Sequence, residues 1–251
     1  MFKKVIIFLA VTITQLDGAS QLTHAYLAKK WLALNPKSEE YRGAFIRGTL
    51  FPDIRYFANL SRELTHEKNV TLKEISSCQD PFEAGKKFHA FVDESRELMV
   101  KKAKIKRTAT KIVNKKTPLF KKYVTMLLKF AEDEIIFTMN DQCTDIAQYL
   151  GPIDPQMRTY KVPDQKLQVW YASLKKWCFS GASLSSVLIK YQMDQQNTAL
   201  FLTIIPAHDL PNFGLTIQAL AQNNHIKTYT KQLLDDFDKT FKKFLKKQKT
   251  S

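Results

Sequence analysis

The segment DPFEAGKKFHAFVDE, residues 80 to 94, constrains the fold most, because it carries a full signal for the start of a helix. Asp80 suits the N-cap position, Pro81 suits the first helical position, and Glu83 stands where a capping-box carboxylate reaches back. Spacings of three and four then place one set of residues along a single stripe: Phe82, Gly85, His89, Val92, Asp93 and Arg96. The segment therefore predicts a helix that presents a histidine and an aspartate one turn apart.

His89 and Asp93 have the spacing of two metal ligands on one helix face. Gly85, one turn before His89, would let a neighbouring backbone or a bound ion come close to that face. The ordinary alternative for such a pair is a hydrogen bond on the helix surface. The pair alone does not decide between these interpretations.

The composition favours a helical fold for the whole chain. The 251 residues are 44% hydrophobic and 12% aromatic, which suffices for a packed core, and they include only 7 glycines. Long runs of alternating polarity and hairpin dipeptides such as Asn-Gly are absent from the sequence. We expect an all-α fold, with residues 21–250 forming a single domain. Gly48 is expected to end a helix that begins near Ser38.

Residues 1–20 resemble a secretory signal peptide. Lys3 and Lys4 precede the apolar run VIIFLAVTI, and small residues follow at Gly18, Ala19 and Ser20. The run is too short to cross a bilayer. The alternative is a buried first strand or helix of a cytosolic protein. We expect an exported bacterial protein, periplasmic or secreted. Its cysteines, Cys78, Cys143 and Cys178, allow at most one disulfide.

The chain is strongly basic, with a formal net charge of +15 and a pI near 9.6. Residues 98–131 contain no acidic side chain, and a C-terminal amphipathic helix is also rich in lysine. Such a surface attracts phosphates, either on anionic lipid headgroups or on nucleic acid. Charge by itself does not separate these partners, and a solvated lysine-rich surface is the third possibility.

Three further residues could join His89 and Asp93 at a metal. Thr23 is expected to cap a helix that His24 opens, Asp53 lies between apolar residues in TLFPDI, and His66 ends a short amphipathic piece at THE. A packed core histidine and a turn acid beside a proline are the ordinary alternatives for His24 and Asp53. Imidazole and carboxylate without thiolate are the ligands typical of catalytic zinc.

The order THAYLA, GTLFPDI, THE and AGKKFHAFVDE, within residues 23–94, resembles the bacterial zinc-dependent phospholipase C family. The resemblance implies an all-α fold that binds up to three zinc ions and is distantly related to fungal single-strand nucleases. It also implies a set of zinc ligands, namely His24, Asp53, His66, His89 and Asp93. Asp53 is in addition the candidate catalytic general base.

The chain departs from the family after residue 94. Family members contribute a later histidine, an H-x-x-x-E pair and an amino-terminal tryptophan, whereas this sequence has no histidine between His89 and His208 and no tryptophan before Trp31. Where the family has H-x-x-x-E, this chain has Phe130 and Glu134. Glu134 is therefore the expected sixth metal ligand, with Asp133 as the alternative. A solvated acidic cluster is the competing interpretation.

The sequence thus predicts a zinc-dependent phosphodiester hydrolase of phospholipase C type, with one to three zinc ions, acting on phospholipid headgroups. A single-strand nuclease of the same fold is the first alternative. The second is a non-catalytic protein that keeps a metal and binds a membrane or another partner.

Overall fold

Every regular element in the described part of the chain is a helix, which confirms the predicted all-α fold. The computed structural model describes residues 18–139, 143–189 and 205–250, so most of the predicted signal peptide lies outside the described residues. The α-helices are α1 (Gln21–Leu34), α2 (Glu39–Leu50), α3 (Arg55–Ala58), α4 (Arg62–Thr65), α5 (Leu72–Ser77), α6 (Pro81–Ala103), α7 (Ile105–Lys116), α8 (Val124–Thr138), α9 (Pro155–Arg158), α10 (Asp164–Trp177), α11 (Leu184–Ile189), α13 (Leu210–Ala221) and α14 (Asn224–Gln248). The 3-10 helices are η2 (Phe51–Ile54), η3 (Pro118–Tyr123), η4 (Thr144–Tyr149) and η7 (Ala207–Asp209).

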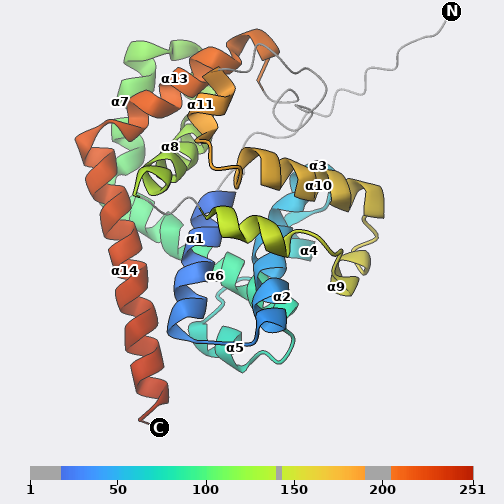
Figure 1. The fold of residues 1–251 in the computed structure, drawn as a ribbon. Helices are drawn as coiled ribbons and strands as arrows, with labels where there is room; N and C mark the ends of the chain where they lie inside the picture. Colours follow the sequence, from blue (N-terminus) through green and yellow to red (C-terminus); the bar gives the residue numbers. More distant parts are fainter. Residues whose placement is uncertain (1–17, 140–142, 190–204, 251) are drawn as a thin grey trace, which may run out of the picture.

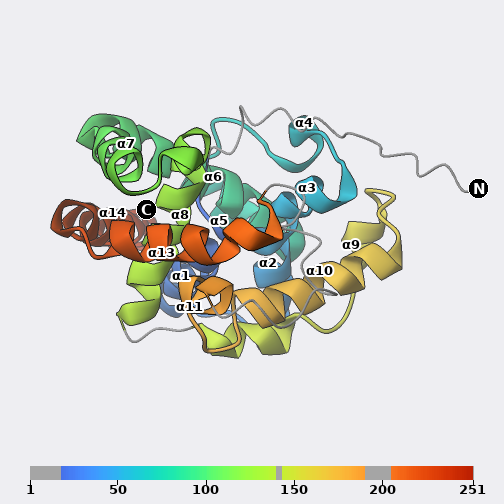
Figure 2. The same ribbon diagram turned by 90° about the horizontal axis from the view of Figure 1, so that it is seen from above.

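The helices α1, α2 and α6 form the centre of the molecule, and the long helix α14 runs along one side (Figure 1). Seen from above, α7, α8 and α13 lie at one end and α9 and α10 at the other (Figure 2). The helix α14 docks on α1 through the apolar stripe that the sequence predicts, since the rings of Phe241 and Trp31 lie 5.4 Å apart. Among the described residues, no helix has the length and apolar character that a membrane span needs.

The helix α6 begins as predicted. Asp80 Oδ1 accepts hydrogen bonds from the backbone N–H groups of Phe82, at 2.8 Å, and Glu83, at 3.0 Å. Pro81 is the first helical residue. The Glu83 carboxylate does not complete a capping box, because it accepts from Lys86 Nζ at 2.8 Å instead. The helix then runs for 23 residues, so one rigid element carries His89, Asp93 and Arg96.

Two glycines let α2 and α6 cross closely. A Cβ atom on Gly48 would overlap the carbonyl oxygen of Phe82, and one on Gly85 would overlap the carbonyl oxygen of Phe45. The prediction that Gly48 ends its helix was therefore wrong, because α2 continues to Leu50 and uses Gly48 for packing. Gly85 does admit a neighbouring backbone, as predicted, and this contact brings α2 and the loop after it against the face of α6 that carries His89.

The first turn of α1 differs from the prediction. Ser20, not Thr23, stands at the N-cap position, and Thr23 lies inside the first turn. Its backbone N–H and its hydroxyl donate to Asp133 Oδ1 of α8, at 3.0 and 2.8 Å. Because the first N–H groups of a helix have no partner within it, Asp133 satisfies one of them from outside. This contact joins α8 to the end of α1 that carries His24.

Candidate metal centre

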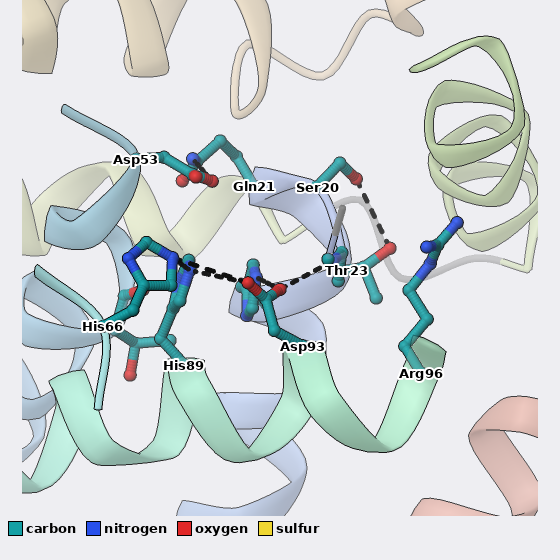
Figure 3. A network of polar contacts seen from close by, with 12 residues as sticks. Ser20, Gln21, Thr23, Asp53, His66, His89, Asp93 and Arg96 are labelled. Atoms are coloured by element: carbon teal, nitrogen blue, oxygen red, sulfur yellow. Dashed lines mark hydrogen bonds and ion pairs between the residues drawn. The ribbon is translucent and has the colours of Figure 1, made fainter. Parts of the chain in front are cut away.

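The five residues expected to bind zinc from the first 94 positions come together in space. Figure 3 shows the Asp93 carboxylate facing His66 and His89, with Asp53 close by, beside Gln21. His24 comes from α1, Asp53 from η2, His66 from the residue after α4, and His89 and Asp93 from α6. They form two overlapping groups in which the ligand atoms lie within 4.8 Å of one another. The groups are His24 with Asp53 and His89, and His66 with His89 and Asp93.

The Asp93 carboxylate is at the centre of this cluster. Its Oδ1 lies 3.1 Å from His24 Nε2, and its Oδ2 lies 3.5 Å from the Nε2 atoms of both His66 and His89. The Nε2 atoms of His66 and His89 are 3.1 Å apart, and the rings of His24 and His89 stack with centroids 3.8 Å apart. The two carboxylate oxygens of Asp93 thus face different histidines, and His89 is the residue that the two candidate groups share.

Neighbouring groups orient two of the imidazole rings. His89 Nδ1 lies 2.8 Å from the carbonyl oxygen of Thr49, to which its N–H donates, so Nε2 is the ring nitrogen that faces the cluster. His66 Nδ1 lies 2.8 Å from the Thr65 hydroxyl. Metal-binding histidines typically have a hydrogen-bond partner on the ring nitrogen that does not face the metal. The Thr49 contact depends on the close crossing of α2 and α6.

Asp53 is held at the edge of the cluster. Buried Phe51 and Ile54 anchor η2 on both sides of it, while Asp53 itself is half-buried. Its Oδ2 accepts a short hydrogen bond from Gln21 Nε2. Asp53 is therefore the carboxylate of the cluster that solvent or a substrate reaches most easily.

Burial and mutual repulsion keep two histidines neutral. Burial, followed by the charge of His89, lowers the pKa of His24 to about 4, and burial likewise lowers the pKa of His66 to about 4. Burial opposes ionisation of Asp93, but His89 and the hydrogen bonds from the histidines hold its pKa well below the ordinary value. Burial opposes the charge of His89, but Asp93 raises its pKa above the ordinary value. Because metals bind neutral imidazoles and ionised carboxylates, His24, His66 and Asp93 already have suitable protonation states, and a metal would displace a proton from His89.

The distances among these atoms fit a tetrahedral cation. Ligand atoms about 2.0 to 2.1 Å from zinc lie roughly 3.3 Å from one another at the corners of a tetrahedron. The three separations among His66 Nε2, His89 Nε2 and Asp93 Oδ2 are 3.1, 3.5 and 3.5 Å. Three polar atoms around the cluster are also buried with no hydrogen-bond partner, namely Gln21 Oε1, His24 Nδ1 and Arg62 Nη1. Unsatisfied polar atoms gathered at one place indicate a site that a ligand completes.

The helix α8 does not bring Glu134 to the cluster. The Glu134 carboxylate accepts a long hydrogen bond, 3.4 Å, from the backbone N–H of Ser185 at α11, and Glu134 belongs to neither group of candidate ligands among the described residues. Asp133, the alternative, binds Thr23. Glu132 is buried against Arg96. The buried acids of α8 are thus Glu132 and Asp133, whereas Glu134, the expected ligand, is only half-buried.

Sequence reasoning missed several polar residues that surround the cluster. Gln21 binds Asp53, Thr49 orients His89, and Arg62 Nη2 lies 3.5 Å from Asp93 Oδ2. Lys129 of α8 is buried nearby. Lys129 and Asp133 are four residues apart and share one helix face, so this spacing was the available signal for Lys129.

A scan against models of protein families, a search of characterised proteins and a search of solved structures each find no match for this chain.

Proposed function

We propose that this protein is a zinc-dependent phosphodiester hydrolase of phospholipase C type. The observation that carries the proposal is the convergence of His66, His89 and Asp93 at tetrahedral separations, with His24 and Asp53 completing a second group. Histidines and carboxylates without thiolate are the ligands of catalytic rather than structural zinc. Bound zinc would supply Lewis-acid polarisation of a phosphoryl oxygen and activation of water at neutral pH.

The residues have distinct roles in this proposal. His66 and His89 would be neutral ligands in one group, with Asp93 balancing the charge of the cation, and His24 and His89 would be neutral ligands in the other. Asp53 is half-buried and accepts a hydrogen bond from Gln21, so its carboxylate can orient the attacking water and take its proton at an Oδ atom. Hydrolysis of a phospholipid in this way releases a diacylglycerol and a phosphorylated headgroup.

The experiment combines metal analysis with product analysis. The purified chain is analysed for bound zinc and then incubated with mixed phospholipid vesicles, with and without a chelator. We expect one to three zinc ions per chain and headgroup release that the chelator abolishes. Headgroup release that is equal with and without the chelator contradicts the proposal. So does the absence of headgroup release from a zinc-loaded protein. Single-stranded DNA is the parallel substrate, and its degradation with lipids left intact would favour the nuclease alternative.

We propose that an anionic membrane contacts a basic face made of exposed residues around α7 and η3. The basic face comprises Lys101, Lys102, Lys104, Lys106, Arg107, Lys111, Lys115, Lys116, Lys121 and Lys122. None of these cations forms an ion pair with a described residue, and Leu98 and Leu119, next to them in the sequence, are 67% and 66% exposed. Unpaired cations beside exposed leucines suit an anionic lipid surface.

Co-sedimentation with vesicles tests this surface. We expect binding to phosphatidylglycerol vesicles, little binding to phosphatidylcholine vesicles, and loss of binding at high salt. The double change Lys115→Glu with Lys116→Glu should weaken binding, whereas equal binding to both vesicle types contradicts the proposal. A membrane partner of this kind agrees with the predicted export, which fractionation of the producing cells would check.

A further inference from the structure

Lys129 is a buried cation that forms no ion pair with any described residue. It lies on α8 with 7% of its surface exposed, and it forms no hydrogen bond or ion pair with the described part of the chain. One turn later on the same face, Asp133 binds Thr23, the residue before His24. Lys129 therefore belongs to the side of α8 that faces the first turn of α1. A buried ammonium without a partner is strongly unfavourable unless something else balances it.

The charges around Lys129 belong to the candidate metal centre. Burial lowers the pKa of Lys129 below its ordinary value, and the carboxylates of Asp53 and Asp93 oppose this shift. The other nearby acids are already committed, because Arg96 binds Glu132 at 2.7 Å and Glu97 at 2.7 Å. The ammonium thus depends on the same carboxylates that a metal would bind.

Arg62 presents a second available donor at the same place. Its Nη2 lies 3.5 Å from Asp93 Oδ2, while its Nη1 is buried and has no hydrogen-bond partner. The side chain is 28% exposed, so part of it reaches solvent while Nη1 stays buried. A guanidinium with one nitrogen near a carboxylate and another free can bind an anion oxygen with the free nitrogen.

Metal binding would leave both cations without an anion. One divalent cation balances the two carboxylates of Asp53 and Asp93, and the histidine ligands are neutral. The charges of Lys129 and Arg62 then lack a counterpart within the cluster. We propose that Lys129 and Arg62 bind the negatively charged oxygens of a phosphate group, and so position a phosphate ester beside the metal centre. This inference rests on the proposed function and adds the residues that recognise the substrate's phosphate.

Calorimetric titration of the zinc-loaded full chain tests the inference. The probes are inorganic phosphate, glycerophosphocholine as a soluble lipid headgroup diester, and a thymidine dinucleotide as a nucleic acid diester. The variants are Lys129→Met, Lys129→Arg and Arg62→Gln, with Lys166→Met on α10 as matched control. Lys166 is an exposed lysine outside the basic face and the cluster, so its removal changes net charge equally but leaves both intact.

We expect Lys129→Met to weaken phosphate binding on the order of tenfold or more, with zinc content unchanged. Lys129→Arg should retain part of the affinity, Arg62→Gln should lose affinity, and Lys166→Met should match the wild type. The probe that binds most tightly identifies the source of the phosphate. The melting temperature of Lys129→Met without phosphate should equal or exceed that of the wild type, because the variant removes an unpaired buried charge.

Two results overturn the inference. One is phosphate affinity in both Lys129→Met and Arg62→Gln within about twofold of the wild type. The other is a wild-type protein that binds none of the probes. Absence of zinc from the wild type is a different failure, since it contradicts the proposed hydrolase. Phosphate binding that depends on Lys129 would then still support the inference.

Discussion

Two buried polar clusters lie one turn apart on α6, and they differ in how completely they are satisfied. Arg96 donates from Nε and Nη2 to both oxygens of Glu132, at 2.7 and 2.8 Å, and from Nη1 to Glu97. At the neighbouring His–Asp cluster, by contrast, two histidine nitrogens face each other and buried polar atoms remain without partners. The first cluster is a closed ion pair, and the second is incompletely hydrogen-bonded.

This difference distinguishes a structural ion pair from a candidate functional site on the same helix. Arg96 and Glu132 are both fully buried, and burial acts to lower the pKa of Arg96 while Glu132 raises it. Such a pair needs nothing further to be stable in the interior. The His–Asp cluster needs either a cation or water to complete its hydrogen bonds. Burial alone does not identify a functional site, whereas incomplete satisfaction does indicate one.

The largest expected effect comes from breaking the closed pair. Arg96→Met leaves the Glu132 carboxylate buried without its partner, and we expect a loss of about 3 to 5 kcal/mol in the free energy of unfolding. Urea denaturation measures this loss. The double variant Arg96→Met with Glu132→Leu should recover most of it, because no unpaired charge remains. A loss below about 1 kcal/mol in the single variant would show that the pair contributes no more than a surface ion pair.

Removing a ligand from the open cluster should have an intermediate effect that depends on zinc. At zinc concentrations about 100 times Kd, binding stabilises the fold by about 2.7 kcal/mol. His89→Ala and Asp93→Ala should each lose this stabilisation and the bound metal. The double variant should add little, because both residues act on the same ion. Zinc stoichiometry and melting temperature, each measured with and without zinc, provide the test.

Glu134→Gln is the matched control for the ligand variants, because Glu134 carries a carboxylate that lies outside both candidate ligand groups. It should retain the zinc content and the zinc-dependent melting temperature of the wild type. Full metal retention by Asp93→Ala would remove Asp93 from the ligand set, and loss of metal in Glu134→Gln would restore the original expectation for Glu134.

The smallest expected effect comes from a residue that contacts a candidate ligand but is not itself a ligand. Thr65→Val removes the hydroxyl that lies 2.8 Å from His66 Nδ1 but keeps the shape of the side chain. We expect roughly tenfold weaker zinc binding, because the ring loses a contact that orients it. Competition with a zinc-sensitive chelator dye measures the affinity. Unchanged zinc affinity would mean that packing alone orients His66.

Local patterns were sufficient to predict the helical fold, whereas the gathering of five polar residues was implied by the resemblance to the phospholipase C family. The Asp80 cap and the His89–Asp93 spacing depend only on neighbours along one helix, so the sequence contains them fully. Glu134 could not be assigned in this way. The helix α8 buries Lys129, Glu132 and Asp133 together, because other helices contact it on more than one side. Periodicity then does not identify which acid meets which partner.

The sequence by itself determined the all-α fold class, the cap of α6 and the residue types that a metal would need, because these follow from short-range spacing and side-chain chemistry. The tertiary structure decided how those residues are used. The close crossing of α2 and α6 brings the Thr49 carbonyl to His89, and the pairing of Arg96 with Glu132 leaves Lys129 unpaired. Such contacts join residues far apart in the chain, and they depend on how whole helices pack, which no local pattern records.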